Sequence, residues 1–505
     1  MASKLLGSTP HSAGFWRASA TIAVLAILAW SGAFVYTTWS PDNYSQILDI
    51  VECKSIWTQL GRPIMDVLYC FIFGGSYQPQ LQLILGLACL ALTCLLIAKD
   101  WIVEDTFERV TLFGIVITFP FLVNIFGFET GKLSIPLAYL LGIFAYSQIR
   151  LPSVGARLSA PFIFAAAVSL YQNSINFVLV SCVVSLFFRF FGCRDKLSAA
   201  DAFRIAIPPL SSVSALLVVG IPIYLIASET SRFILRAGYN ERYSLVGGFQ
   251  TPAGLALRLR DIGAHYKYFL LPGHPLIPPV FGLFIILSCL FVFLFLIRSY
   301  FLPSEGSAVV PLLAIVFYLS SFVLVWATDL PIKGSLLGDG YRHTYPVCLV
   351  FAASSIAALR LSSIIRLRWL VKAFVICSLS AFVVLDQSWA FATYRLSIYD
   401  QALANRVAAQ FAADNQYGKL MPFYVVGMLP ASSRPMGLKP LGYDVLGSAF
   451  DSPYSAKALL RAVGLHFVEP SSRQEIDCRT LYSAMVDDRP MAVDSKCAVL
   501  DLSRL

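Results

Sequence analysis

The feature that most constrains this chain is a succession of apolar runs, each about as long as a bilayer is thick. A helix needs about 20 apolar residues to cross the hydrocarbon core of a membrane. Of the 505 residues, 57% are hydrophobic and 13% are charged, whereas a soluble domain is about one-quarter charged. We therefore expect a polytopic α-helical membrane protein with about eleven transmembrane helices. The predicted spans lie near residues 18–38, 80–98, 110–128, 133–149, 159–171, 174–190, 207–227, 277–297, 308–328, 344–361 and 369–386.

The charged residues agree with such a topology. The net charge is +9, and the basic residues are scattered through short loops and form no stripe. We attribute this charge to the positive-inside bias of cytoplasmic loops and not to nucleic-acid binding. The first apolar run follows Lys4, His11 and Arg17 and lacks a clear cleavage site. We interpret it as a retained span that leaves the N-terminus in the cytoplasm.

Two stretches need an argument from length. About forty mostly apolar residues separate Arg109 from Arg150, which is twice the length of one span. If the chain crosses twice, both arginines lie in the cytoplasm and Glu129 lies outside. The shorter run within residues 157–189 is interrupted at residues 171–174. This favours two short passes, and a single long tilted helix is the alternative.

The predicted spans divide the chain into a transmembrane domain, residues 1–386, and an extracytoplasmic tail, residues 387–505. The tail is long enough for a modest core, and its pattern predicts a small α/β domain. The outer loops are expected at residues 39–79, 128–132, 228–276 and 328–343. In the tail we expect helices near 390–415 and 455–463, with strands at 421–429 and 497–502.

The cysteines give no sign of a metal site. Most of the eleven lie in apolar segments, where cysteine behaves as a small buried hydrophobic residue. Cys478 and Cys497 lie in the polar tail, and a disulfide between them is expected if the tail is extracytoplasmic. No CxxC pair or histidine cluster has metal-ligand spacing, so we expect no bound metal.

The first outer loop carries the residues that are best suited to catalysis and phosphate binding. Asp42 follows the first span closely, and a carboxylate near the membrane surface can accept a proton from a sugar hydroxyl. Its alternative role is to cap a short interfacial helix, because Pro-Asp-Asn is a helix-start signal. Arg62 can clamp a phosphate with its fork of donors, or it can be an arginine that reaches the interface from a helix start.

Other candidates lie in the later outer segments. Glu129 and Lys132 either contribute to a site or form an ordinary interfacial ion pair. The run Tyr171, Gln172 and Asn173 either caps a tight helical hairpin or lines a sugar pocket with donors and acceptors.

Basic residues on the predicted outer side run against the positive-inside trend. Arg342 and His343 stand at the start of a span. The long loop 228–276 is rich in arginine, and it can meet lipid phosphates or form an amphipathic helix that lies on the membrane. Its basic residues are Arg232, Arg236, Arg242, Arg258, Arg260 and Lys267.

Several short motifs, taken in order, resemble one known family. Pro41-Asp42-Asn43, then Trp57, then Gly61-Arg62-Pro63 is similar to the first-loop signature of the serotype-converting O-antigen glucosyltransferases, which are phage-type membrane enzymes. Agreement continues through most of the membrane part. The further matching stretches are residues 119–123, 128–129, 170–172 and 340–342.

The resemblance implies a C-type glycosyltransferase architecture with its active site on the extracytoplasmic side. It implies polyprenyl-phosphate-glucose as donor and the O-antigen of lipopolysaccharide as acceptor. Asp42 takes the place of the second acid of an Asp-Asp pair, and Glu129 that of a carboxylate in the next outer loop. Pro41 stands where the first acid is common. This departure argues against a paired-carboxylate site and against a metal that depends on it.

We therefore assign roles to named residues as expectations. Asp42 is the catalytic base and Glu129 a second acidic contact. Arg62 and Arg342 receive the charge of the leaving phosphate, which makes a metal unnecessary. The expected sugar or acceptor contacts are Asn43, Trp57, Tyr171, Gln172 and His343.

The sequence thus predicts a multi-pass glucosyltransferase of the bacterial inner membrane with a periplasmic tail and no cofactor. Its expected partners are membrane lipid, the lipid-linked sugar and the O-antigen, with functional links to a lipid-sugar flippase and a polyprenyl-phosphate glucose synthase. A flippase or transporter is one alternative, but it predicts buried charges within spans and repeated halves, and the sequence shows neither. An O-antigen polymerase or another lipid-dependent transferase, such as one that adds aminosugars to lipid A, is the other.

Overall fold

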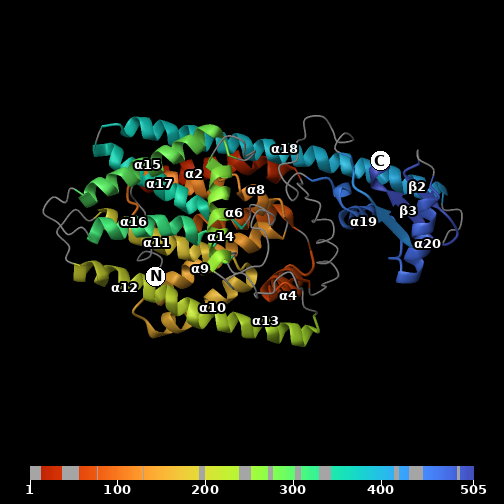
Figure 1. Ribbon diagram of the computed structural model, residues 1–505, viewed down its shortest axis with the longest axis horizontal. Helices are drawn as coiled ribbons and strands as arrows, with labels where there is room; N and C mark the ends of the chain where they lie inside the picture. The colour runs from red at the N-terminus through yellow and green to blue at the C-terminus, as the bar shows by residue number, and fades with distance from the viewer. Residues whose placement is uncertain are drawn as a thin grey trace.

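The protein is described here from a computed structural model. It describes residues 13–36, 56–76, 78–128, 130–192, 199–237, 252–270, 277–301, 309–328, 343–364, 366–414, 420–430, 447–485 and 489–505. Long helices run side by side in one bundle, and a small α/β unit lies beyond one end of it (Figure 1).

The first half of the bundle is built from apolar helices, and short turns join those from α6 to α11. Asp105 starts one of them by accepting hydrogen bonds from the N–H groups of Phe107 and Glu108, which satisfies two of the free donors at a helix N-terminus. The helices are α2 (Ala13–Val35), α6 (Pro79–Asp100), α7 (Thr106–Thr118), α8 (Leu122–Phe126), α9 (Gly131–Ile149), α10 (Val154–Leu170) and α11 (Ser174–Gly192).

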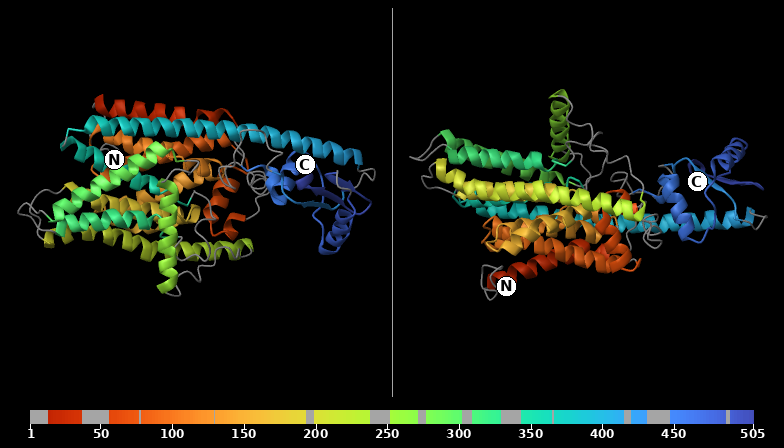
Figure 2. Two further views of the ribbon diagram at one scale, coloured as in Figure 1. Left: turned by 45° about the horizontal axis from the view of Figure 1, so that its top comes forward. Right: turned by 90° about the horizontal axis from the view of Figure 1, so that it is seen from below.

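The second half contains longer rods and one helix that crosses them. The crossing helix is α14 (Pro252–Leu270), which lies roughly at right angles to the bundle (Figures 1 and 2). The others are α12 (Ala199–Ala215), η2 (Leu216–Gly220, a π-helical turn), α13 (Ile221–Leu235), α15 (Pro279–Phe301), α16 (Val309–Leu324), α17 (Val347–Ile364) and α18 (Arg368–Asp414).

These helices have the length and composition of a membrane protein. Among the described residues, six helices are long and apolar enough to cross a bilayer, and four further apolar helices are shorter. Large apolar side chains such as Ile27, Phe162 and Leu294 are exposed on the outside of the bundle, where lipid would cover them. Each predicted span overlaps a described helix, while the count of eleven crossings remains a prediction.

The α10–α11 region forms two helices and not one. The chain breaks at Tyr171, whose extended backbone ends α10, and α11 begins at Ser174. Within the first outer loop, the described part forms the short helices α4 (Ile56–Gln59), α5 (Pro63–Asp66) and η1 (Val67–Ile72).

One continuous helix links the bundle to the tail. The boundary predicted at residue 386 falls inside α18, which runs unbroken for 47 residues. No proline or glycine occurs between Arg368 and Asp414, so nothing in the backbone ends the helix after the predicted span. The last turns of α18 instead supply Leu403, Val407 and Phe411 to the core of the α/β unit.

That α/β unit contains a three-stranded sheet of order β1-β3-β2. Strand β1 (Phe423–Val426) pairs in parallel with β3 (Ala498–Asp501), and β2 (Met491–Val493) pairs antiparallel with β3. The helices α19 (Pro453–Ala462) and α20 (Ser472–Ser483) complete it, with short 3₁₀ turns η6 (Ala449–Asp451) and η7 (Leu502–Arg504). Neither α20 nor β2 was predicted, because the sequence of α20 is mostly polar and β2 is only three residues long.

Candidate functional site

The described part of the first outer loop folds into a tight, anchored turn. The Asp66 carboxylate accepts hydrogen bonds from the Thr58 N–H at 2.7 Å and from the Thr58 hydroxyl at 2.5 Å. Burial raises the pKa of Asp66, and the bonds from Thr58 oppose this because they favour the charged form. The Arg62 N–H closes the turn by donating to the Trp57 carbonyl at 2.7 Å. The turn therefore fixes the backbone on both sides of Arg62.

Gly61 allows this turn to come close to the bundle. Its φ of +72° lies in the left-handed region, and a Cβ there would lie 2.9 Å from the Tyr224 hydroxyl. That hydroxyl donates to the Gly61 carbonyl at 3.0 Å. Tyr224 belongs to α13, so the turn is tied to a helix distant in sequence.

Arg62 is oriented by neutral side chains from the α10–α11 turn. Its Nε donates to Gln172 Oε1 at 3.0 Å, and its guanidinium carbon lies 5.1 Å from the centre of the Tyr171 ring. Gln172 Nε2 in turn donates to the Gly61 carbonyl at 3.3 Å. The guanidinium group is thus held in a fixed orientation. Its terminal nitrogen atoms, which are fixed with it, are of the kind that pairs with phosphate oxygens in bidentate contacts.

His343 joins this group from a third part of the chain. Its ring centre lies 5.9 Å from that of Tyr171, and its carbonyl accepts a hydrogen bond from Asn173 Nδ2 at 2.8 Å. Asn176, one turn further along α11, donates to the Val325 carbonyl at 2.8 Å. We call Arg62, Tyr171, Gln172, Tyr224 and His343 the Arg62 cluster.

The structure therefore brings together several of the residues predicted from sequence. Arg62, Tyr171, Gln172 and His343 are in one cluster, and Trp57 is buried in the turn beside it. Sequence analysis missed the contribution of Tyr224, since nothing in an apolar helix indicates which tyrosine meets a distant loop. Four predicted site residues, Asp42, Asn43, Glu129 and Arg342, lie outside the described residues.

The basic segment 228–276 is partly helical. Arg232 pairs with Glu229 at 2.9 Å near the end of α13. Arg260 and Lys267 lie on exposed positions of α14, while Ile262 and Phe269 are buried on its other side. The helix and its orientation are compatible with the interfacial alternative considered from sequence.

In the tail, Cys478 of α20 and Cys497, next to β3, are joined in a disulfide with their Cα atoms 5.5 Å apart. Their sulfur atoms lie in the small core that packs α20 on the sheet. Within the described ranges, no group of three histidine, cysteine or acidic side chains is placed to hold a metal.

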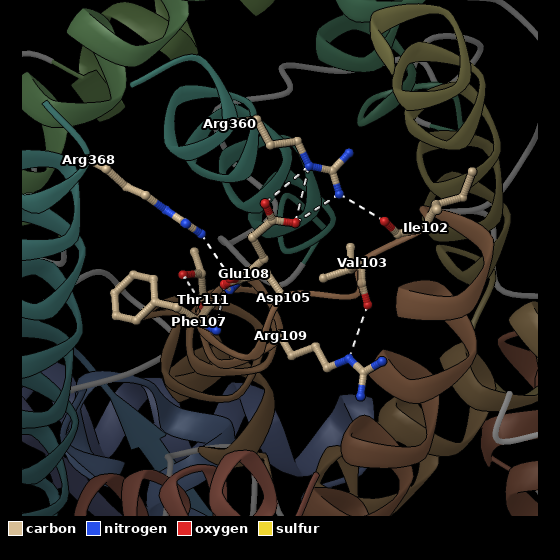
Figure 3. Close-up of polar contacts among 9 residues, drawn as sticks. All are labelled: Ile102, Val103, Asp105, Phe107, Glu108, Arg109, Thr111, Arg360 and Arg368. Carbon is tan, nitrogen blue, oxygen red and sulfur yellow. Dashed lines mark hydrogen bonds and ion pairs between the residues drawn. The ribbon is translucent and has the colours of Figure 1, made fainter. Parts of the chain in front are cut away.

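A second group of arginines pairs with carboxylates at the start of α7 (Figure 3). Arg360 of α17 makes a fork of hydrogen bonds to Glu108 of α7, the shortest of them 2.8 Å. Arg368 pairs with Asp105 at 2.9 Å. Close to these, Asp100 at the end of α6 pairs with Arg150, the residue that follows α9, and with Arg189 of α11. These ion pairs bind the ends of neighbouring helices to one another.

One acidic residue departs from the sequence interpretation. We expected charges to collect in loops, with Asp386 at the very end of a span. Because α18 continues past it, Asp386 lies fully buried within the helix, and neither of its carboxyl oxygens has a hydrogen-bond partner among the described residues. The sequence analysis did not predict this buried carboxyl group.

Comparison with known proteins gives one match. A family model described as Glucosyl transferase GtrII matches residues 33–335, which is more than half of the chain. The matched region contains the anchored turn and the α10–α11 turn. No curated protein and no solved structure matches the chain.

Proposed function

Because the chain belongs to the GtrII glucosyl transferase family, we propose that it moves glucose from polyprenyl-phosphate-glucose to a hydroxyl group of the O-antigen of lipopolysaccharide. The family match confirms the resemblance to serotype-converting glucosyltransferases. The reaction is proposed to take place on the periplasmic side of the bacterial inner membrane. The observation that carries the proposal is the Arg62 cluster, which holds a cation rigidly with neutral partners.

The chemistry requires one bond to form and one to break. The acceptor oxygen attacks the anomeric carbon, the bond from that carbon to the phosphate oxygen breaks, and the lipid phosphate leaves with both electrons. The hydroxyl proton goes to a base, for which Asp42 remains our candidate. Arg62, and by our prediction Arg342, would stabilise the negative charge that grows on the leaving phosphate.

The geometry supports this role for Arg62 in two ways. Its Nε bond to Gln172 and its position over Tyr171 reduce the freedom that a long side chain would lose on binding. The cluster also lies where α10 ends and α11 begins, whereas arginine ion pairs join the other end of α11, at Arg189, to the ends of α6 and α9. A positive-inside topology would put that arginine-rich end in the cytoplasm and the Arg62 cluster outside.

The decisive experiment is the mass of the O-antigen repeat unit in cells with and without the protein. We expect a gain of one hexose, lost in the Asp42→Asn variant and strongly reduced in Arg62→Lys, which keeps the charge but loses the planar fork. The matched control is Arg157→Lys, because the one hydrogen bond of its side chain in the described part of the chain goes to the nearby Leu151 carbonyl, at the other end of α10. An unchanged repeat-unit mass in wild-type cells would overturn the proposal.

Transport of a lipid-linked saccharide is the second candidate, and the buried Asp386 is the observation that favours it. It predicts no mass gain. Instead, lipid-linked sugar would accumulate on one membrane face when the protein is removed.

A further inference from the structure

The buried Asp386 lies on a face of α18 that is turned toward α7 and α8. Four residues before it, Phe382 packs against Phe119 with ring centres 5.8 Å apart. Three residues after it, Trp389 approaches Gly127 so closely that a Cβ there would lie 3.3 Å from the indole. Residues spaced by three and four share one side of a helix. Asp386 therefore faces the segment between Phe119 and Gly127, which includes α8.

Contacts of the next residue, Gln387, show where Asp386 lies along the bundle. Gln387 donates to the Ala29 carbonyl at 3.2 Å and to the Ser31 hydroxyl at 2.9 Å, close to the end of α2. Asp386 comes 18 residues after Arg368, about 27 Å along a helix, and the hydrocarbon core of a bilayer is about 30 Å thick. Asp386 thus lies close to one bilayer thickness from Arg368, toward the end of α18 that joins the α/β unit.

Two other nearby polar side chains, those of Asn124 and Trp389, are also buried without hydrogen-bond partners in the described part of the chain. Asn124 of α8 stands one turn before Gly127, and the Trp389 indole lies close to Gly127. Both amide atoms of Asn124, both carboxyl oxygens of Asp386 and the indole nitrogen of Trp389 are buried without a hydrogen-bond partner in the described part of the chain. Buried polar groups are normally satisfied, and each exception calls for a water, a ligand or a functional role.

The chemistry of these three side chains selects a class of ligand. The three side chains include no cation, so this set does not fit the charged part of a lipid carrier. It offers acceptors from the acid and the amide, and donors from the amide and the indole. Hydroxyl groups both donate and accept. Aromatic rings surround the set, since Trp30 packs on Phe126 at 4.6 Å and on Trp389 at 6.2 Å. A few convergent polar groups in aromatic surroundings are typical of a small-molecule site.

We propose that Asn124, Asp386 and Trp389 bind the hydroxyl groups of a hexose. The proposal rests on the proposed glucosyltransferase function and adds a sugar site to the phosphate site at Arg62. The hexose belongs either to the lipid-linked donor or to the acceptor glycan, and the experiment below separates these sources.

The test uses the full-length protein in detergent and the variant Asp386→Leu. The first readout is the shift in melting temperature caused by a short-chain prenyl phosphate glucose, compared with the same prenyl phosphate without sugar. The second is the KM for donor and for acceptor. Leucine removes an unsatisfied buried acid, so melting temperature without ligand should stay equal or rise. If the site takes the donor sugar, the extra shift due to glucose disappears and donor KM rises at least tenfold.

If the site takes the acceptor, the donor shift persists and acceptor KM rises instead. Unchanged shifts and unchanged KM values in Asp386→Leu would overturn the proposal while leaving the transferase assignment intact. Absence of glycosyl transfer by the wild type would overturn the transferase assignment itself. Ser378→Ala is the matched control, because Ser378 is buried on the same helix but bonds its own backbone at Phe374. If Asp386→Leu fails to insert, Asn124→Ala is measured in the same way, with the same expected result.

Discussion

The two ends of the bundle hold arginine in opposite ways. At one end, Arg360 and Arg368 each face a carboxylate, so their charge is neutralised within the protein. At the other end, Arg62 is held by an amide and an aromatic ring, and no ion pair to it is found in the described ranges. A neutralised arginine joins helices, whereas one fixed by neutral partners keeps its charge for an incoming anion. The two roles of arginine are therefore distinguished by the side chains that contact each guanidinium group, and not by sequence position.

The largest expected effect comes from Arg360. Its carboxylate partner Glu108 is only 8% exposed, and removing one member of a buried pair typically costs about 3–5 kcal/mol. Arg360→Met should lower the free energy of unfolding by that amount in detergent, while the transfer rate per folded molecule stays unchanged. The double variant Glu108→Gln/Arg360→Met should recover much of the loss. A variant that is stable but inactive would show that this end also serves catalysis.

Arg62 should show the reverse pattern. Removal of one donor that stabilises charge in a transition state lowers the rate by about 100- to 1,000-fold. Arg62→Ala should therefore transfer sugar at least 100-fold more slowly, with a melting temperature close to that of the wild type. A large loss of stability with normal turnover of the folded fraction would place Arg62 in the same structural class as Arg360.

Gln172 tests whether orientation matters as well as charge. Gln172→Ala keeps Arg62 but removes its Nε partner. One hydrogen bond to a charged group contributes about 1.5–3 kcal/mol, so we expect a rate about tenfold or more below that of the wild type. Gln59→Ala, on α4 beside the turn, is the control. An effect as small as that of the control would mean that Arg62 is positioned by its backbone alone.

The smallest effect is expected from Arg368. Its pair with Asp105 is more than one-third exposed on both sides, and pairs of this kind are worth about 0–1 kcal/mol. Arg368→Gln should change the melting temperature little, and the change should shrink further at high salt. A destabilisation as large as that of Arg360→Met would show that burial is not what separates the two pairs.

The sequence predicted what depends on local pattern. Apolar runs located the bundle helices, because span length is a property of each segment alone. The motifs singled out Arg62 and Gln172, and the start of a span singled out His343; the structure brings these residues together from positions up to 281 residues apart (343 − 62). The burial of Asp386 was not predictable, since it depends on α18 continuing and on which helices pack against it. Tyr224 was missed for the same reason.

Because α18 is unbroken, it connects the bundle and the α/β unit as one rigid helix. At 1.5 Å per residue its 47 residues form a rod about 70 Å long. Near one end Arg368 pairs with Asp105; near the other, Asp400 accepts hydrogen bonds from Ser448 and Ala449 of the α/β unit. A tilt of one degree about the Arg368 end would displace the far end by about 1.2 Å. The tilt of α18, which its packing against the rest of the bundle sets, and the sideways position of the α/β unit are therefore coupled.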